Sequence, residues 1–176
     1  MFSKIHATKS EIAMSLPGDD VLPDAPLVID SAFDLPASPD VVYPWFVQLG
    51  KKRAGWYFTR FTEKFFLPSA RGIRHIEPKW QNLKVGDRIP DYGKDGYFDC
   101  FYLKPNETIG YTSERGKIAM TWVLTFHKSA AGTRVIIRQR AKGFKNRPLF
   151  MRLGKLIDRL TISWLAAGLR ERLAKT

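Results

Sequence analysis

Cysteine and histidine are scarce in this chain of 176 residues. The single cysteine, Cys100, excludes an internal disulfide framework and a metal site built from several cysteines. The three histidines, at positions 6, 75 and 127, lack the close spacing of paired zinc ligands. A glycine-rich phosphate loop, a dinucleotide-binding glycine motif and a nucleophile elbow are missing too. We therefore expect no metal and no cofactor.

Long apolar runs are also missing. No stretch approaches the roughly 18 apolar residues that a membrane span requires. The first residues are charged and lack the apolar core of a secretory signal. A chain of this length can bury about 70% of its unfolded surface, which suffices for a core without cross-links. We expect a cytoplasmic protein with one domain over residues 1–176, of which residues 1–25 form an N-terminal extension.

Charge, in contrast, is abundant and unevenly placed. The chain carries 29 basic and 17 acidic residues, a net charge of +12. Residues 1–40 hold two basic and seven acidic side chains, a local charge of −5, so the rest of the chain carries +17. Such a surface attracts anions, including anionic membranes and nucleic acids, although it can also serve solubility alone. Nucleic acid is the less favoured partner, because no helix-turn-helix, finger spacing or aromatic single-strand platform is present.

The first half of the chain is predicted to contain short helices around one strand. We expect helices at 8–14, 38–50 and 56–66, a strand at 27–33 and an irregular crossing at 67–83. Ser38 and Pro39 form a typical helix start, since serine caps the first turn and proline fits the first helical position. Apolar residues then recur at helical spacing from Val42 to Leu49.

From residue 84 onward, alternation with a period of two predicts antiparallel strands. The strands are expected at 85–89, 97–103, 108–112, 119–127 and 133–141. Trp122 and Leu124 share one face of the predicted hairpin, whereas Arg134 and Arg138 point to the other, so the sheet should have an apolar and a polar face. A long helix over 148–173 follows, with Pro148 in its first turn, an apolar stripe that includes Trp164, and room left by small residues.

This order of elements predicts an α+β fold, with the helices segregated from a run of strands. A curved antiparallel sheet would wrap around the long C-terminal helix, and two short helices would follow the first strand. Sheet and helix together would enclose a cavity, which is a common kind of small-molecule site.

Several short stretches carry a family resemblance. They are 8–11 with 16–19, 44–50 with 53–57, 83–90, 121–124 and 133–140. In this order, over roughly residues 8–173, they resemble the SRPBCC superfamily, also called START-like or helix-grip, in its polyketide cyclase/dehydrase branch. The resemblance implies a deep, mainly apolar cavity for lipids, sterols, polyketides or aromatic compounds, in enzymes as well as in binding proteins. It assigns no catalytic residue by position.

Twelve side chains are candidates for contacts with a ligand in such a cavity. They are Trp45, Trp56, Tyr57, Tyr92, Phe98, Cys100, Tyr102, Trp122, Leu124, Gln139, Ile157 and Trp164. Each can instead be ordinary core, because large apolar residues mostly pack against one another. Trp122 and Trp164 are expected to face each other from sheet and helix. Gln139 is unusual because related sequences carry an aliphatic residue there, and a buried amide requires a hydrogen-bond partner.

The sequence offers two candidate catalytic side chains. His75, two residues before Glu77, has the chemistry of a general base, but a solvated loop histidine explains it as well. The phenol of Tyr57 is suited to polarising a ligand carbonyl. Three functions therefore stay open. One is a binding protein for an apolar or aromatic small molecule, one is a cyclase- or isomerase-like enzyme acting on such a molecule, and one is a basic protein that binds anionic membranes.

Overall fold

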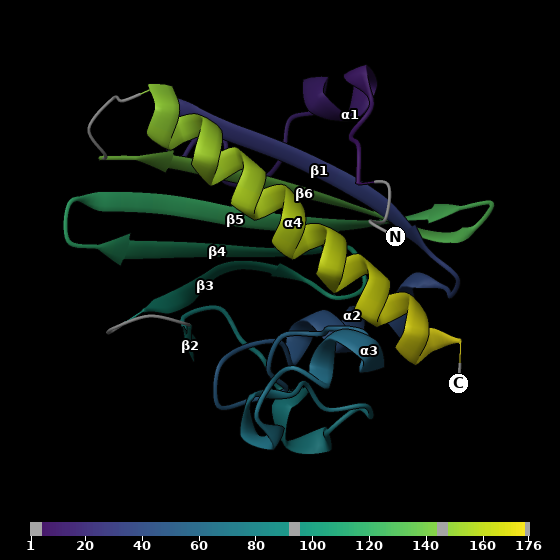
Figure 1. The fold of residues 1–176 in the computed structure, drawn as a ribbon. Coiled ribbons are helices and arrows are strands. Elements are labelled where there is room, and N and C mark those ends of the chain that lie inside the picture. Colours follow the sequence, from purple (N-terminus) through teal and green to yellow (C-terminus); the bar gives the residue numbers. More distant parts are fainter. Residues whose placement is uncertain (1–4, 92–95, 144–147, 175–176) are drawn as a thin grey trace.

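The computed structural model describes residues 5–91, 96–143 and 148–174. Within these residues, six antiparallel strands form one sheet in the order β1-β6-β5-β4-β3-β2 (Figure 1). The strands are β1 (Leu27–Leu35), β2 (Arg88–Pro90), β3 (Tyr97–Lys104), β4 (Thr108–Arg115), β5 (Ile118–Ser129) and β6 (Gly132–Lys142). The helices are α1 (Lys9–Ala13), α2 (Pro39–Val47), α3 (Arg60–Glu63) and α4 (Pro148–Leu173), with 3-10 turns at Pro68–Ala70 and Pro78–Trp80.

The long helix α4 runs diagonally across one face of the sheet, and α2 and α3 lie at one end of it (Figure 1). One end of α4 is tied to the first strand, where Arg170 Nε donates to the carbonyl oxygen of Asp34 at 3.0 Å. This is the predicted α+β arrangement of a curled sheet and a C-terminal helix, with short helices after the first strand. The helix-grip fold class predicted from the sequence is therefore confirmed.

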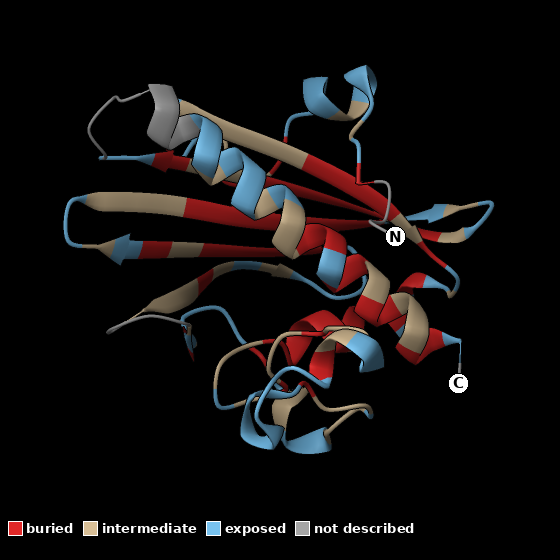
Figure 2. Ribbon diagram, viewed as in Figure 1, coloured by how far each residue is buried: buried red, intermediate tan, exposed pale blue. Residues whose placement is uncertain are grey.

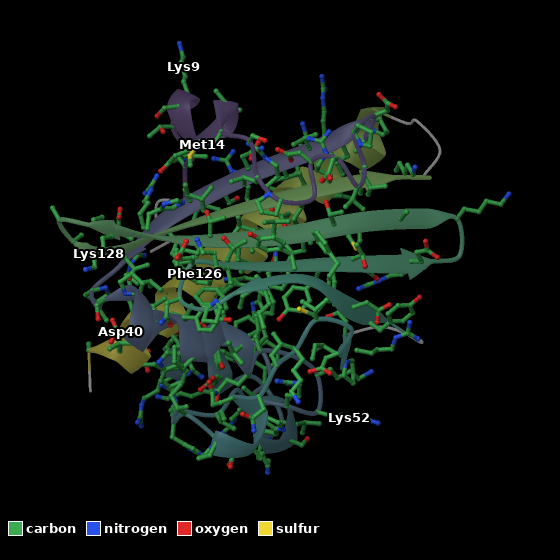
Figure 3. All side chains as sticks on the ribbon, turned by 180° about the vertical axis from the view of Figure 1, so that it is seen from behind. Lys9, Met14, Asp40, Lys52, Phe126 and Lys128 are labelled. Atoms are coloured by element: carbon green, nitrogen blue, oxygen red, sulfur yellow. The ribbon has the colours of Figure 1, made fainter. Side chains whose placement is uncertain are left out.

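The hydrophobic core lies between the sheet, α2 and the second half of α4. Phe126 on β5 is in edge-to-face contact with Phe46 of α2, with ring centroids 5.1 Å apart, and Figure 3 shows it on the α2 side of the sheet. Ile162 and Leu165 of α4 are fully buried in the same cluster. The period-two alternation on β5 and β6 produces this core, because it places every second side chain on the face that α2 and α4 cover.

The two halves of α4 differ in burial, as Figure 2 shows. Ile162 and Leu169 are buried, but Leu153 and Ile157, which lie on the apolar stripe of the helix, are 51% and 53% exposed. The stripe therefore continues as a helical face beyond the part that the described residues cover. No helix in the described part of the chain combines the length and the apolar character needed to cross a bilayer.

The N-terminal segment covers the outer face of the sheet, which the sequence predicts to be polar and solvated. Arg138 of β6 is only 5% exposed. It donates to Asp19 at 2.8 Å, to Asp30 at 2.7 Å and to the carbonyl oxygen of Ile12 at 2.6 Å. Figure 3 shows α1 over this face, with Lys9 directed away from the protein. The acidic first forty residues thus neutralise arginines of the sheet, which explains the uneven charge.

Several boundaries differ from the sequence-based expectations, and two of these differences have a clear local cause. The predicted helix 56–66 is only α3, because Thr59 caps it by accepting from the backbone N–H of Thr62 at 3.2 Å. The strand predicted at 85–89 is only β2, because residues 84–87 form a turn. In that turn the Lys84 N–H donates to the Asp87 carboxylate at 2.8 Å, and Gly86 has a φ of 94°. The starts of α2 at Pro39 and of α4 at Pro148 are as predicted.

Candidate functional site

A cavity of about 630 Å³ lies between the sheet and the first half of α4. Its apolar lining comes from the segment around α3, from β3 and β5, and from α4. These residues are Trp56, Phe58, Phe66, Ala70, Phe98, Met120, Trp122, Gly154, Ile157 and Ile162. Its polar lining is Asp91, Arg115, Gln139, Asp158 and Thr161. The cavity is thus mainly apolar with a few polar groups, as is usual for small-molecule sites.

Stacked aromatic rings form one wall of this cavity. Trp122, on the inner face of β5, stacks with Trp56 at 6.2 Å and with Tyr111 at 5.9 Å between ring centroids. Phe98 tilts against Trp122 at 5.5 Å. Trp56 Nε1 donates to the carbonyl oxygen of Thr161 at 3.4 Å, which ties this wall to α4. The wall is therefore connected both to the sheet and to α4.

Gln139 and Asp158 form a polar pair within the cavity lining. Gln139 Nε2 donates a hydrogen bond to Asp158 Oδ1, so β6 and α4 are joined here. Desolvation raises the pKa of Asp158 from 3.8 to about 6, although the hydrogen bond from Gln139 opposes the shift. The second carboxylate oxygen, Oδ2, is buried without a hydrogen-bond partner among the described residues. Buried polar atoms normally have partners, so this orphan atom is a feature to explain.

Trp122 carries a second orphan polar atom. Its side chain is only 8% exposed, and its Nε1 is buried without a partner in the described part of the chain. Trp122 and Gln139 are direct cross-strand partners in the β5–β6 ladder, so their side chains leave the sheet side by side. An unpaired donor and an unpaired acceptor thus belong to adjoining parts of one cavity wall.

The remaining charged groups of the lining pair with each other. Arg115 of β4 donates to the Asp91 carboxylate and to Ser113 Oγ, the latter at 3.1 Å. Its guanidinium lies 5.2 Å from the ring centroid of Phe98. This pair therefore brings two mutually compensated charges to the cavity, in contrast to the single carboxyl of Asp158.

The structure brings five of the predicted ligand-contact residues to this cavity. They are Trp56, Phe98, Trp122, Gln139 and Ile157. Leu124 lines an adjoining small hollow of about 30 Å³. Trp45 and Cys100 are buried in the core, and burial raises the pKa of the Cys100 thiol to about 11. Tyr92 lies outside the described residues.

Two further predicted contacts lie at partly exposed positions. Tyr102 is 37% exposed and does not belong to the cavity lining. The ring contact of Trp164 is with Phe58 at 5.8 Å, whereas the ring contacts of Trp122 are with other aromatic residues. The two tryptophans predicted to face each other therefore have different partners.

Neither candidate catalytic residue lines the cavity. The Tyr57 hydroxyl donates to the Trp45 carbonyl oxygen at 2.8 Å and accepts from Gln48 Nε2 at 3.0 Å. Burial raises the pKa of this phenol above its ordinary value. His75 is exposed, with its Nε2 3.6 Å from a carboxylate oxygen of Glu77. Tyr57 is thus fully hydrogen-bonded within the core, and His75 faces solvent.

The sequence did not point to Asp158. Among the described residues, it is the charged side chain of the cavity lining that has no ion-pair partner. In the sequence it stands on a helix rich in arginine and lysine, where an acidic residue among basic ones is typical of a solvated face. The available signal was Gln139, a polar residue at an apolar position that required a partner. No group of three or more histidine, cysteine, aspartate or glutamate side chains suited to a metal occurs among the described residues.

No family model matches this chain, and no curated protein matches it. Its fold is similar to that of CalU16 from Micromonospora echinospora, with a TM-score of 0.52 and 14% identity over 82% of this chain and 75% of that one. The Aha1 dimer from Colwellia psychrerythraea has a TM-score of 0.52 and 15% identity over 82% and 96% of the two chains. Protein MLL2253 from Mesorhizobium loti has a TM-score of 0.50 and 16% identity over 85% and 98%. At these identities the similarity shows the fold alone, which is α+β and helix-grip-like.

Proposed function

We propose that this protein binds an apolar or aromatic small molecule, such as a lipid, polyketide or terpenoid, between the sheet and α4. The observation that carries the proposal is the cavity of about 630 Å³ with its mainly apolar lining. Ligand pockets of about 300–1,000 Å³ accommodate molecules of drug size. The resemblance to the polyketide cyclase branch of the SRPBCC superfamily supports the same ligand class.

The aromatic wall favours a ligand that contains a ring. Trp56, Trp122 and Phe98 present neighbouring ring systems to the cavity. Stacked or edge-on contacts with such rings contribute roughly 0.5–1.5 kcal/mol per pair beyond the burial of apolar surface. A planar or polycyclic apolar molecule therefore gains more at this wall than a flexible chain of the same area.

Gly154 allows a direct test of where binding takes place. It lines the cavity, and a Cβ added to it would meet nothing within 4 Å. The variant Gly154→Phe should fill part of the cavity and weaken binding of the neutral fluorophore N-phenyl-1-naphthylamine at least about tenfold. Lys155→Phe introduces the same ring one position away, on an exposed site outside the lining, and should bind like the unmodified protein. Equal binding by all three proteins would contradict the proposed site.

An enzyme acting on such a ligand is the alternative within the same cavity. The favouring observation is the Asp158 carboxyl, since a cavity carboxyl with a raised pKa is typical of acid–base groups. Incubation with aromatic polyketide precursors should then yield cyclised or isomerised products, and Asp158→Asn should abolish them. Tight binding without any product would favour the binding protein.

A second candidate function, membrane binding, rests on exposed apolar residues around the cavity. Phe65 and Leu67 are 77% and 76% exposed beside the cavity residue Phe66, and Leu153 and Leu156 are about half exposed beside Ile157. Exposed basic side chains accompany both groups. These are Lys64, Arg71, Arg152 and Lys155. Apolar and basic side chains together suit an anionic bilayer, through which an apolar ligand would be loaded.

Vesicle flotation tests this second candidate. The protein should float with vesicles of phosphatidylserine and phosphatidylcholine, and Phe65→Ser combined with Leu67→Ser should abolish flotation. The exposed pair Val21→Ser and Val85→Ser, which lies outside the cavity lining, should leave it intact. Because basic side chains would contribute, binding should weaken as salt rises from 50 to 300 mM. Absence of flotation at low salt would refute the proposal.

A further inference from the structure

Two orphan polar atoms in one apolar cavity point to the ligand's chemistry. Asp158 Oδ2 and Trp122 Nε1 are buried without partners among the described residues, and both side chains line the cavity. Gln139 links them, since it is the cross-strand partner of Trp122 and donates to Asp158 Oδ1. An unpaired buried polar group costs about 1–3 kcal/mol, so a molecule that supplies the missing partners binds more tightly than one that does not.

We propose that Asp158, Gln139 and Trp122 form a recognition point for a hydroxyl group on an otherwise apolar, ring-containing ligand. This inference rests on the proposed binding function and specifies its ligand class. The ligand hydroxyl donates to Asp158 Oδ2, and an oxygen of the ligand accepts from Trp122 Nε1. A hydroxyl fits both needs, because it is a donor and an acceptor at once. Gln139 acts as a positioning residue that holds the carboxyl in place.

The charges around the recognition point favour a neutral hydroxyl over an anionic or a cationic group on the ligand. A carboxylate or phosphate on the ligand would meet Asp158 as a like charge. A ligand amine would satisfy Asp158, but the chain's net charge of +12 disfavours the approach of cations. The neighbouring pair Arg115–Asp91 is compensated internally and adds no net charge to the lining.

The other charged groups near the recognition point lie on outward-facing surfaces. Arg138 and Arg140 of β6 face the N-terminal segment on the opposite side of the sheet, where they bond to Asp19. On α4, Lys155 and Arg159 are exposed, and Arg159 reaches His6. Among the described residues, Asp158 is therefore the cavity carboxyl without an ion-pair partner.

Two matched probes test this inference. The probes are 2-naphthol and 2-methylnaphthalene, which have nearly the same shape, but only the first carries a hydroxyl. Binding is measured by quenching of tryptophan fluorescence at pH 7.5. The double variant Gln139→Leu with Asp158→Leu removes both polar partners together, so neither is left unpaired in the lining. The variant Trp122→Phe removes the indole N–H and retains an aromatic ring.

The preference for 2-naphthol over 2-methylnaphthalene should fall about tenfold in the double variant and several-fold in Trp122→Phe, as expected for lost hydrogen bonds. Binding of 2-methylnaphthalene should stay within about twofold in the double variant. An unchanged preference, with both probes still bound, would overturn this inference and leave the proposed binding function standing. Binding of neither probe to the unmodified protein would overturn both proposals. Circular dichroism of each variant separates loss of binding from loss of folding.

Discussion

Gln139 of β6 donates a hydrogen bond to Asp158 of α4, within the lining of the cavity between sheet and helix. The pair joins the two layers at a place where both otherwise present apolar surface. It explains the unusual glutamine, whose amide has found the partner that burial requires. It also places a carboxyl in an apolar wall, with consequences for stability and for pH dependence.

The raised pKa of Asp158 predicts a stability that falls as pH rises. Its folded-state pKa is about 6 and its ordinary value is 3.8, so between these values the folded state binds more protons than the unfolded state. Stability is therefore lost as pH increases from about 4 to about 6. Asp158→Asn removes this dependence and should raise the free energy of unfolding at pH 7.5 by roughly 1–2 kcal/mol, less than the full shift because the residue is partly exposed. Urea unfolding at pH 4 and 7.5 measures it. A variant that loses stability equally at both values would contradict the prediction.

For Glu11, in the N-terminal segment, we expect the opposite dependence of stability on pH. The hydrogen bond from Arg134, at 2.7 Å, is the main cause that lowers the Glu11 pKa from 4.5 to about 2. The stabilisation is present above about 4.5 and is lost as pH falls towards about 2. Glu11→Gln should therefore destabilise the protein by about 1 kcal/mol at pH 7 and have little effect near pH 2. Thermal unfolding at both pH values measures this. Asp24→Asn, at a position without an ion pair to a described residue, is the charge-matched control.

The buried guanidinium of Arg172 is expected to contribute strongly to the stability of the region around α3. Its guanidinium donates to Glu63 at 2.9 Å and to the carbonyl oxygens of Ile73 and Phe58, both at 2.8 Å. Arg172→Met should cost about 3–5 kcal/mol, because it leaves buried acceptors unpaired. Arg60→Met, which removes an exposed ion pair with Glu171, should cost at most about 1 kcal/mol. Equal unfolding midpoints in urea for both variants would contradict this ranking.

Substitution of glycine by alanine is expected to have opposite effects on stability at two positions of α4. A Cβ at Gly168 would lie 2.4 Å from the carbonyl oxygen of Tyr57, so Gly168→Ala requires the chain to move apart. We expect a loss of about 2 kcal/mol or more for it. At Gly154 the Cβ meets nothing, so Gly154→Ala should stabilise the helix by about 0.5–1 kcal/mol. Calorimetric melting temperatures that shift in the same direction would contradict the assignment.

Local patterns predicted most of the elements of this fold. Pro39 and Pro148 mark the starts of α2 and α4, because proline fits the first turn of a helix better than any later turn. The hairpin β5–β6 follows from side chains that alternate between two faces. Of the five predicted ligand contacts that line the cavity, Phe98, Trp122 and Gln139 lie on strands and Ile157 lies on α4, whereas Trp56 lies in the segment before α3.

Patterns of this kind did not reveal which polar groups meet across the fold. Asp158 is nineteen positions from Gln139, and Glu11 is more than a hundred from Arg134. Tyr57 has the chemistry of a ligand contact, but its hydroxyl is occupied by Gln48 and Trp45 within the core. Periodicity assigns a side chain to a face of its own element and contains nothing about the element opposite.

The sequence by itself determined the order of helices and strands, the amphipathic character of α4 and the excess of positive charge, because these depend on neighbouring residues alone. Only the tertiary structure decided that the acidic N-terminal segment covers the arginines of β6, and that α4 buries its second half while its first half borders a cavity. It also decided that two carboxyls line that cavity and that one of them, Asp158, has no ion-pair partner among the described residues. The physical reason is that burial and pairing belong to surfaces in contact, and those contacts arise between segments far apart in the chain.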